Sequence, residues 1–173
     1  MYKIIFIYIL LILIFSCEVK FKSNITKEIE HPDIVIGEFK YVSTDQYGRK
    51  EWIIKASEAK IYNNRNEVFL YNMTMTFFNE SNQVKTFVSA NGGYINRFTK
   101  DVFAEGKVKI VSESQSMLEA NRIYWSNDIK KFYSHPNELV LLIRKNAKIY
   151  GYNLIADFEL KEATLESTEG DIE

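Results

Sequence analysis

The amino-acid sequence predicts an all-β fold, in the form of bent antiparallel hairpins repeated along the chain. Three observations support this prediction: one segment recurs four times, apolar and polar residues alternate within it, and no segment after residue 16 shows helical periodicity. The 173 residues are 46% hydrophobic, which is enough for one domain with a substantial core. Two prolines and seven glycines in that length argue against a disordered chain.

The repeat is clearest around four small residues, Ala56, Ala90, Ala120 and Gly151, which recur at intervals of 34, 30 and 31 residues. Such a regular spacing indicates one supersecondary unit that is laid down repeatedly. In the first three copies two apolar residues flank one polar position, as in Ile54-Lys55-Ala56. This period of two is typical of a strand with one buried face.

The alternation slips directly after each small residue. The next inward candidates follow three and five residues later, where a regular strand would place them two and four residues later. One extra residue at this point predicts a β-bulge or a tight corner at which the strand bends. A small residue at the bend allows backbones to approach closely or leaves a cavity. Each unit is therefore predicted to be a bent hairpin.

Strands and turns alternate from Ile34 onward. The clearest predicted strands cover residues 35–42, 52–56, 68–78, 104–111, 132–133 and 139–143. Polar turns are predicted at residues 44–49, 63–66 and 79–82. Short strands at this spacing, with an aromatic content of 14%, favour a sandwich or a barrel-like roll. In the last of these strands Leu139, Leu141 and Ile143 share one face, although Val140 and Leu142 make the other face apolar too.

The N-terminus has the layout of an export signal. Residues 4–15 form an unbroken apolar run, shorter than the roughly 20 residues that a membrane-spanning helix needs. The run closes at Cys17, the only cysteine, in a sequence that resembles a bacterial lipobox. We therefore predict a lipoprotein-type signal peptide over residues 1–16, acylation of Cys17 as a membrane anchor, and a polar tether over residues 17–33. A plain signal peptide or short anchor with an incidental cysteine is the alternative.

Composition excludes several classes of function. A net charge of −1 provides no bulk attraction to nucleic acid, and a single cysteine allows no intramolecular disulfide. His31 and His135 each precede a proline and have no ligand partner nearby in the sequence, so no metal site is predicted. There is no glycine-rich phosphate loop, nucleophile elbow or HExxH motif. We expect neither an enzyme nor a bound cofactor.

Five motifs, in this order and at this spacing, resemble the LptC family of the lipopolysaccharide export pathway. They lie within residues 48–62, 90–93, 105–110, 118–124 and 149–157, and the resemblance spans roughly residues 34–165. LptA, the periplasmic bridge protein, shares the fold, but the single N-terminal membrane attachment favours LptC. LptC proteins usually carry a transmembrane helix at that point, whereas this chain carries the lipobox-like sequence.

The resemblance implies an open, twisted β-jellyroll over residues 34–166, followed by an acidic tail over residues 167–173. It also implies an apolar groove that takes the acyl chains of lipopolysaccharide or a related glycolipid from the LptB, LptF and LptG transporter and passes them to an LptA-like bridge. The protein would be periplasmic and anchored to the inner membrane. The inward residues would be Trp52, Ile54, Ala56, Met73, Met75, Phe77, Val88, Ala90, Val108, Ile110, Leu118, Ala120, Leu139, Leu141 and Ile143.

Partner proteins would join at the two edges of the sheet, by pairing with unpaired strands. The predicted edge residues are Phe39 and Tyr41 toward the transporter, and Leu154, Ala156, Leu160 and Leu165 toward the bridge. One alternative is a structural or adaptor lipoprotein with a dry core that joins partners only by its edges. Another is a β-rich extracellular enzyme, which the lack of a clustered catalytic constellation disfavours.

Overall fold

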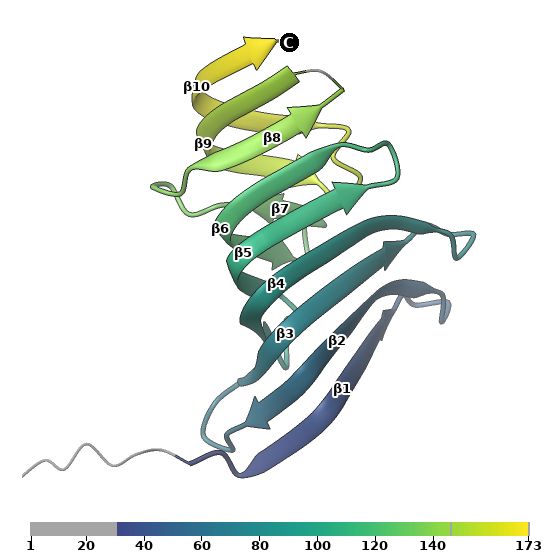
Figure 1. The fold of residues 1–173 in the computed structure, drawn as a ribbon. Helices are drawn as coiled ribbons and strands as arrows, with labels where there is room; N and C mark the ends of the chain where they lie inside the picture. Colours follow the sequence, from purple (N-terminus) through teal and green to yellow (C-terminus); the bar gives the residue numbers. More distant parts are fainter. Residues whose placement is uncertain (1–30, 146, 173) are drawn as a thin grey trace, which may run out of the picture. The chain divides into compact units, whose positions relative to one another are not determined.

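The computed structural model describes residues 31–145 and 147–172, and this part of the chain forms one antiparallel sheet of ten strands without a helix (Figure 1). The strands are β1 (Ile34–Thr44), β2 (Lys50–Ile61), β3 (Glu67–Phe78), β4 (Val84–Asn96), β5 (Val102–Ser112), β6 (Met117–Ser126), β7 (Lys131–Tyr133), β8 (Val140–Arg144), β9 (Ala147–Asp157) and β10 (Ala163–Ile172). The predicted all-β class is confirmed. The predicted export signal, Cys17 and nearly all of the tether lie outside the described residues.

Each strand pairs with the next one along the chain, in the order β1-β2-β3-β4-β5-β6. Beyond β6 the sheet divides for a short distance, because β6 pairs with β7 through residues 124–126 and with β8 through residues 117–119. Strand β9 then pairs with both β7 and β8, and β10 forms the far edge. The sheet is therefore built almost entirely from consecutive hairpins, as the sequence repeat predicts.

A line of irregular positions crosses the whole sheet and divides each long strand in two. Backbone φ is positive at Glu38, Asn72, Lys107 and Asn153, and the regular pairing between β5 and β6 is interrupted between Glu105 and Val108. One extra residue on one strand bends that strand and increases its twist. Because the irregularities lie at the same level, on every second strand from β1 to β5 and again on β9, the bends add up to one continuous fold line, which we call the bend.

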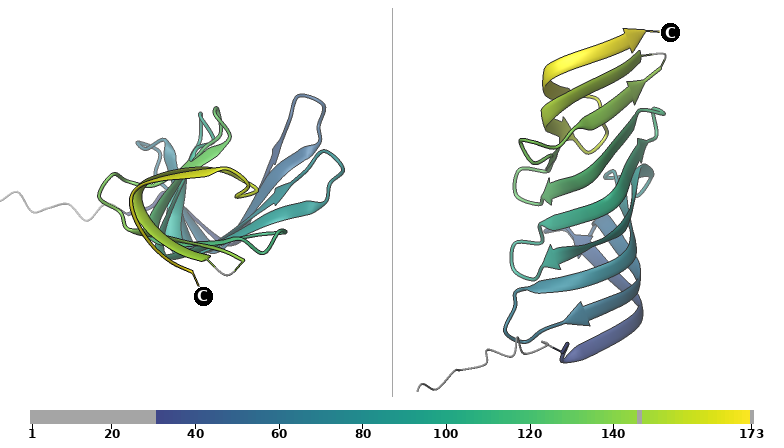
Figure 2. Two further views of the ribbon diagram at one scale, coloured as in Figure 1. Left: turned by 90° about the horizontal axis from the view of Figure 1, so that it is seen from above. Right: turned by 60° about the vertical axis from the view of Figure 1, so that its left-hand side comes forward.

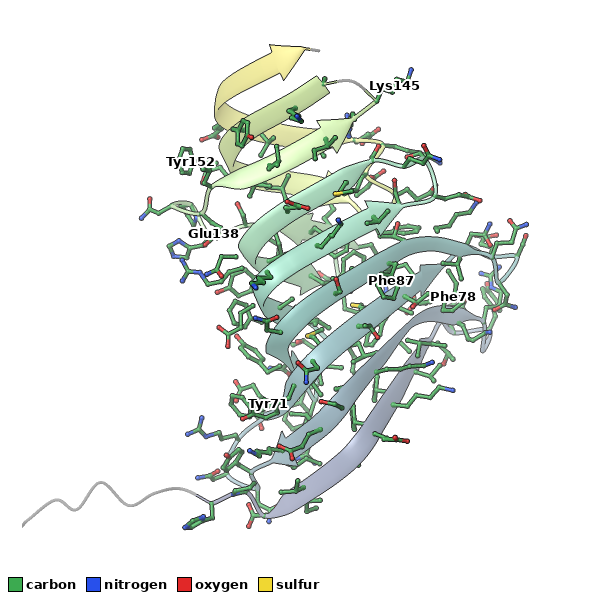
Figure 3. All side chains as sticks on the ribbon, viewed as in Figure 1. Tyr71, Phe78, Phe87, Glu138, Lys145 and Tyr152 are labelled. Atoms are coloured by element: carbon green, nitrogen blue, oxygen red, sulfur yellow. The ribbon has the colours of Figure 1, made fainter. Side chains whose placement is uncertain are left out.

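The bend folds the sheet back on itself, as the view from above in Figure 2 shows. We call residues 39–56, 73–90, 108–120 and 140–151 the front wall, and residues 34–37, 58–70, 93–105, 122–134 and 154–165 the back wall. Figure 3 labels Tyr71, Glu138 and Tyr152 along the bend. It labels Phe78 and Lys145 at the other ends of the front-wall strands, away from the bend. The interior of the domain lies between the two walls.

The slip in alternation that the sequence shows is the bend itself. In β2 the inward residues on either side are Ala56 and Ala59, three positions apart, and both are buried. In β4 the equivalent pair is Ala90 and Gly93, which lie opposite Met73 and Leu70 of β3. The prediction of a bend at this point in the repeat is confirmed, and the extra residue of a bulge lies on β5, in its pairing with β4 and β6.

Gly93 shows why small residues are needed at the bend. A Cβ atom added to Gly93 would lie 1.9 Å from the carbonyl oxygen of Phe103 on β5. Real Cβ atoms do not approach oxygen so closely, so any side chain here would push β4 and β5 apart. At this position of the second copy, three residues after Ala90, glycine therefore permits a close approach of two backbones.

The last strand extends further than the sequence predicts. Strand β10 continues to Ile172, so residues 167–172, predicted as an acidic tail after the domain, continue the sheet. At the other end of the domain, the amide of Asp33 donates to the carbonyl oxygen of Ile61 at 2.9 Å, and its carboxylate accepts from the amide of Asn63 at 2.7 Å. The chain is therefore attached to the back wall one residue before β1 begins.

Candidate functional site

The interior between the two walls is the candidate functional site, because the predicted groove residues gather there. Those of β2 to β6 on the front wall are buried: Trp52, Ile54, Ala56, Met73, Met75, Phe77, Val88, Ala90, Val108, Ile110 and Leu118. Ala120 is half-buried and packs against them. Their inward orientation agrees with the sequence prediction. Contact of these residues with lipid stays a prediction.

The predicted orientation of the next strand is wrong. Leu142 of β8 lies opposite the buried Leu118 of β6, so it shares the inner face with it, and Val140 does so too. Val140 and Leu142 are 0% and 2% exposed, whereas Leu139 is 51% exposed. Leu141 and Ile143 are only half-buried and occupy the outer face with Leu139. Both faces of this segment are apolar, so the register with β6 decides the orientation, and the alternation alone does not.

Sequence reasoning missed the back-wall half of the interior. Its buried residues are Ala59, Val68, Leu70, Ile95, Val102, Ala104, Ile123, Trp125, Phe132, Leu154 and Ala156. The signal was present in the slip of alternation, since β2, β4 and β6 change their inward parity at the bend, whereas β5 does not. That slip marks Ala59, Ile95 and Ile123 as inward candidates, but the predicted groove does not include them.

An aromatic cluster joins the two walls near the strand ends opposite the bend. Phe77 of the front wall lies 4.6 Å from Trp125 and 5.4 Å from Phe132 of the back wall, measured between ring centroids. Phe158, in the turn after β9, stacks on Phe77 with an interplanar angle of 25°. We call these four rings the inner aromatic cluster. They fill the space between the walls there and hold the walls together.

A cavity of about 360 Å³ opens beside this cluster, at the strand ends opposite the bend. Its apolar lining comes from Trp52, Phe77 and Phe78 of the front wall, and from Trp125 and Phe158. We call this cavity the mouth. It is the place where the apolar interior meets the surface, and both tryptophans of the chain line it.

Charged side chains line the rim of the mouth, and they are paired with one another. Nε of Arg49 lies 2.7 Å from the carboxylate of Asp45, and Nζ of Lys130 lies 2.8 Å from that of Glu51. Desolvation raises the pKa of Asp45, but hydrogen bonds from Arg49 and Tyr47 outweigh it, so this pKa lies below its ordinary value. The rim is thus polar and nearly neutralised, above an apolar floor.

Two further hydrogen bonds cross the rim of the mouth near the start of β2. The indole Nε1 of Trp52 donates to the side-chain oxygen of Asn127 at 3.2 Å, and Lys130 donates to the same oxygen at 3.1 Å. Together with the ion pair of Lys130 and Glu51, they connect the start of β2 to the turn between β6 and β7. The walls are therefore joined here by side chains, with no strand pairing between them.

The outer face of the back wall carries a second row of rings. Successive centroids along it are 4.7 to 6.1 Å apart. The row consists of Tyr62, Phe69, Tyr94, Phe103, Tyr124 and Tyr133, all half-buried, and we call it the outer aromatic ladder. The last four are direct cross-strand neighbours on β4 to β7. Burial raises the pKa of the Tyr94 and Tyr133 hydroxyls.

The predicted edge residues lie on an edge strand at the N-terminal edge of the sheet, but most of those predicted for the C-terminal edge do not. Strand β1 is an edge, and it holds Phe39 and Tyr41, as expected. Leu154 and Ala156 are wrongly assigned, because β9 pairs on both sides and both residues are buried. Leu160 is buried in the turn before β10, and only Leu165 lies on the C-terminal edge strand. The pairing of β10 along the other side of β9 places β9 inside the sheet.

The described residues give no indication of a metal centre or of a membrane-spanning helix. Within residues 31–145 and 147–172, no group of three His, Cys, Asp or Glu side chains could hold a metal ion. The same part of the chain contains no helix that is long and apolar enough to cross a membrane.

Comparison with known proteins identifies one family. Residues 3–172 match the family model described as LptC, lipopolysaccharide-assembly, LptC-related. The match covers nearly the whole chain and agrees with the resemblance found in the sequence motifs. No curated protein matches the chain.

Proposed function

We propose, from the premise that this chain belongs to the LptC family, that its two walls carry the acyl chains of a glycolipid between them. Membership of this family implies a role in lipopolysaccharide transport and a periplasmic location associated with the cell envelope. The LptC family is a family of lipid-transport proteins. The proposal adds the place on this chain where the lipid is held, and the direction in which it passes.

The observation that carries the proposal is an apolar interior that reaches the surface at the mouth. Trp52 and Phe77 on one wall face Trp125 on the other, and a cavity of about 360 Å³ lies between them. Each methylene group that moves from water into such surroundings gains about 0.8 kcal/mol. An acyl chain that enters through the mouth is thereby favoured, while a polar head group stays at the charged rim.

Transfer between proteins would use the two edges. Strand β1 offers unpaired backbone groups flanked by exposed Ile34, Val35 and Val42, and β10 offers them at the other end of the sheet. A partner strand that pairs with either edge would extend the sheet, and its bend could continue the interior. We propose that β1 meets the LptF or LptG domain of the LptB-containing transporter, and that β10 meets an LptA-like bridge.

The N-terminal anchor remains part of the proposal. Acylation of Cys17 would hold the domain at the inner membrane, with residues 18–33 as the tether. Metabolic labelling of the full chain with a radioactive fatty acid would test this, with Cys17→Ser as the control variant. Equal labelling of both chains would contradict acylation at this cysteine.

The central experiment tests for lipid in the interior. A photoreactive phenylalanine analogue replaces Phe77, which is 2% exposed at the mouth, or Phe87, which is 44% exposed on the outer face of the front wall (Figure 3). Both positions already hold phenylalanine, so the two variants disturb packing little. After irradiation of living cells, we expect a lipid adduct at position 77 and none at position 87.

The filling of the interior favours a second candidate, an adaptor that joins partners through its edges and carries no lipid. The inner aromatic cluster occupies the space between the walls beside the mouth, and Met75 and Ile110 on the inner face of the front wall are at most 1% exposed. Absence of a lipid adduct at position 77, in a folded protein whose β1 still captures a partner, would favour the adaptor and overturn the lipid-transfer proposal.

A further inference from the structure

The turn between β9 and β10, residues 158–162, folds into the open side of the interior. The side chain of Leu160 is 1% exposed, and Phe158 stacks on Phe77 of the inner aromatic cluster, with 5.7 Å between ring centroids. The other side chains of the turn that reach outward, Lys161 and Glu162, are exposed. The turn therefore places two apolar side chains where the two walls would otherwise part.

Side chains of the front wall hold this turn in place. Nη2 of Arg144, at the end of β8, donates to the carbonyl oxygens of Leu160 and Lys161, at 2.5 and 3.1 Å. The hydroxyl of Thr86 on β4 donates to the carbonyl oxygen of Phe158. These three hydrogen bonds come from side chains, so the turn could separate from the front wall without breaking any pairing between strands.

One feature shows that the closed position has a cost. Nε of Arg144 is buried and has no hydrogen-bond partner among the described residues, so the contact between the turn and the front wall leaves a polar atom unsatisfied. The positive φ of Leu160, 55°, belongs to the turn itself, since Asn82 and Gln115 have φ of 59° and 63° at the same position of their own turns.

We propose that residues 158–162 form a lid that closes the interior in the empty protein and moves away when an acyl chain enters. This inference rests on the proposed function. Phe158 and Leu160 occupy apolar surroundings that an acyl chain would also seek, so chain and lid compete for the same space. Arg144 and Thr86 act as the latch, and the unsatisfied Nε of Arg144 lowers the cost of release.

The two tryptophans provide a direct readout, because Trp52 and Trp125 are the only tryptophans and both line the mouth. The full chain is reconstituted in phosphatidylcholine nanodiscs and mixed with stearic acid that carries a doxyl spin label on its chain. The spin label quenches tryptophan fluorescence on contact, so the quenching rate reports entry of the acyl chain into the mouth.

Arg144→Ala removes the two latch hydrogen bonds, and we expect quenching about fivefold faster or more than in the wild type. Lys161→Ala is the matched control: it lies in the same turn, its side chain is exposed, and its Nζ pairs with the carboxylate of Glu159, away from the latch. Its quenching rate should equal that of the wild type. In the wild type, hydrogen exchange at the amides of residues 158–162 should accelerate when stearic acid is added.

Equal quenching rates in the wild type and Arg144→Ala, without a change in hydrogen exchange, would overturn the lid. Thr86→Val provides a second test, since it removes the other latch hydrogen bond with little change in volume. Its quenching rate is also expected to exceed that of the wild type. Absence of quenching in every variant, with native circular dichroism, would instead overturn the proposed function itself.

Discussion

The inner aromatic cluster and the outer aromatic ladder use the same residue types for different purposes. The cluster joins residues far apart in the sequence, since Phe77 meets Trp125 and Phe132 across the interior. The ladder joins neighbouring strands, ring by ring, on a surface that stays half-open to water. Aromatic content alone says little about burial, because the face of the strand that a ring occupies decides which set it joins: Tyr124 belongs to the ladder and the adjacent Trp125 to the cluster.

Loss of a ring from the inner cluster should have the largest effect. Phe77→Ala would leave a cavity between the walls, and we expect the free energy of unfolding to fall by about 3–5 kcal/mol. Chemical denaturation followed by circular dichroism measures this change. Phe87→Ala, on the exposed outer face, is the control and should cost less than about 1 kcal/mol. Similar losses at both positions would contradict the assignment of an inner cluster.

The inward face of β8 can be tested in the same way. Val140→Ala removes two buried methyl groups at a position that is 0% exposed, so we expect a loss of about 2 kcal/mol. Leu139→Ala removes more atoms, yet at a position that is 51% exposed, and should change the free energy of unfolding by less than about 0.5 kcal/mol. A larger loss at Leu139 would restore the orientation that the sequence predicted.

A ring in the middle of the outer ladder should matter less than one in the inner cluster. Phe103 contacts Tyr94 at 5.1 Å and Tyr124 at 4.7 Å, and cross-strand pairs of this kind contribute about 0.2–1 kcal/mol each. Phe103→Ala should therefore lower the free energy of unfolding by about 1–2 kcal/mol, measured by denaturation. Phe98→Ala, in an exposed turn, should have almost no effect. Equal values for the two would show that the ladder does not stabilise the sheet.

The smallest expected effect is a loss of stability at alkaline pH. Burial raises the pKa of Tyr94 and of Tyr133 in the folded protein, with neighbouring Tyr124 adding to both. The unfolded chain loses these protons at a pH near 10, before the folded protein does, so the free energy of unfolding should fall as the pH rises above about 10. Thermal melts between pH 9 and 11 measure this. A steeper fall in Tyr94→Phe than in the wild type would contradict it.

The bend, and the inward residues of β2 to β6 on the front wall, could be predicted from the sequence for a physical reason. A small residue followed by a slip in alternation is a local signal, and it recurs in copies whose spacing can be counted. The β8 segment lacked such a signal, because Leu139 to Ile143 are apolar on both faces and follow a loop that resets the register. There the orientation depends on pairing with Leu118, which is a long-range contact.

Two other features were hidden for different reasons. The ladder rings alternate with inward residues, so each tyrosine resembled an ordinary half-polar strand position until the pairing of strands aligned them. Phe158 and Leu160 are apolar residues within a segment that was predicted to lie on the C-terminal edge, and no local pattern separates a turn that folds inward from a strand that continues. The pairing of strands was needed to align the ladder rings, and the topology beyond β6 was needed to place Phe158 and Leu160.

The bend is produced locally, by left-handed residues on β1, β3, β5 and β9 and by the extra residue of β5. The cross-section of the folded sheet is therefore set by individual hairpins, and its length by the number of hairpins. Duplication of one hairpin would lengthen the interior without changing its cross-section. A partner domain whose sheet bends at the same level could continue the interior across the junction, so that separately folded domains would form one channel.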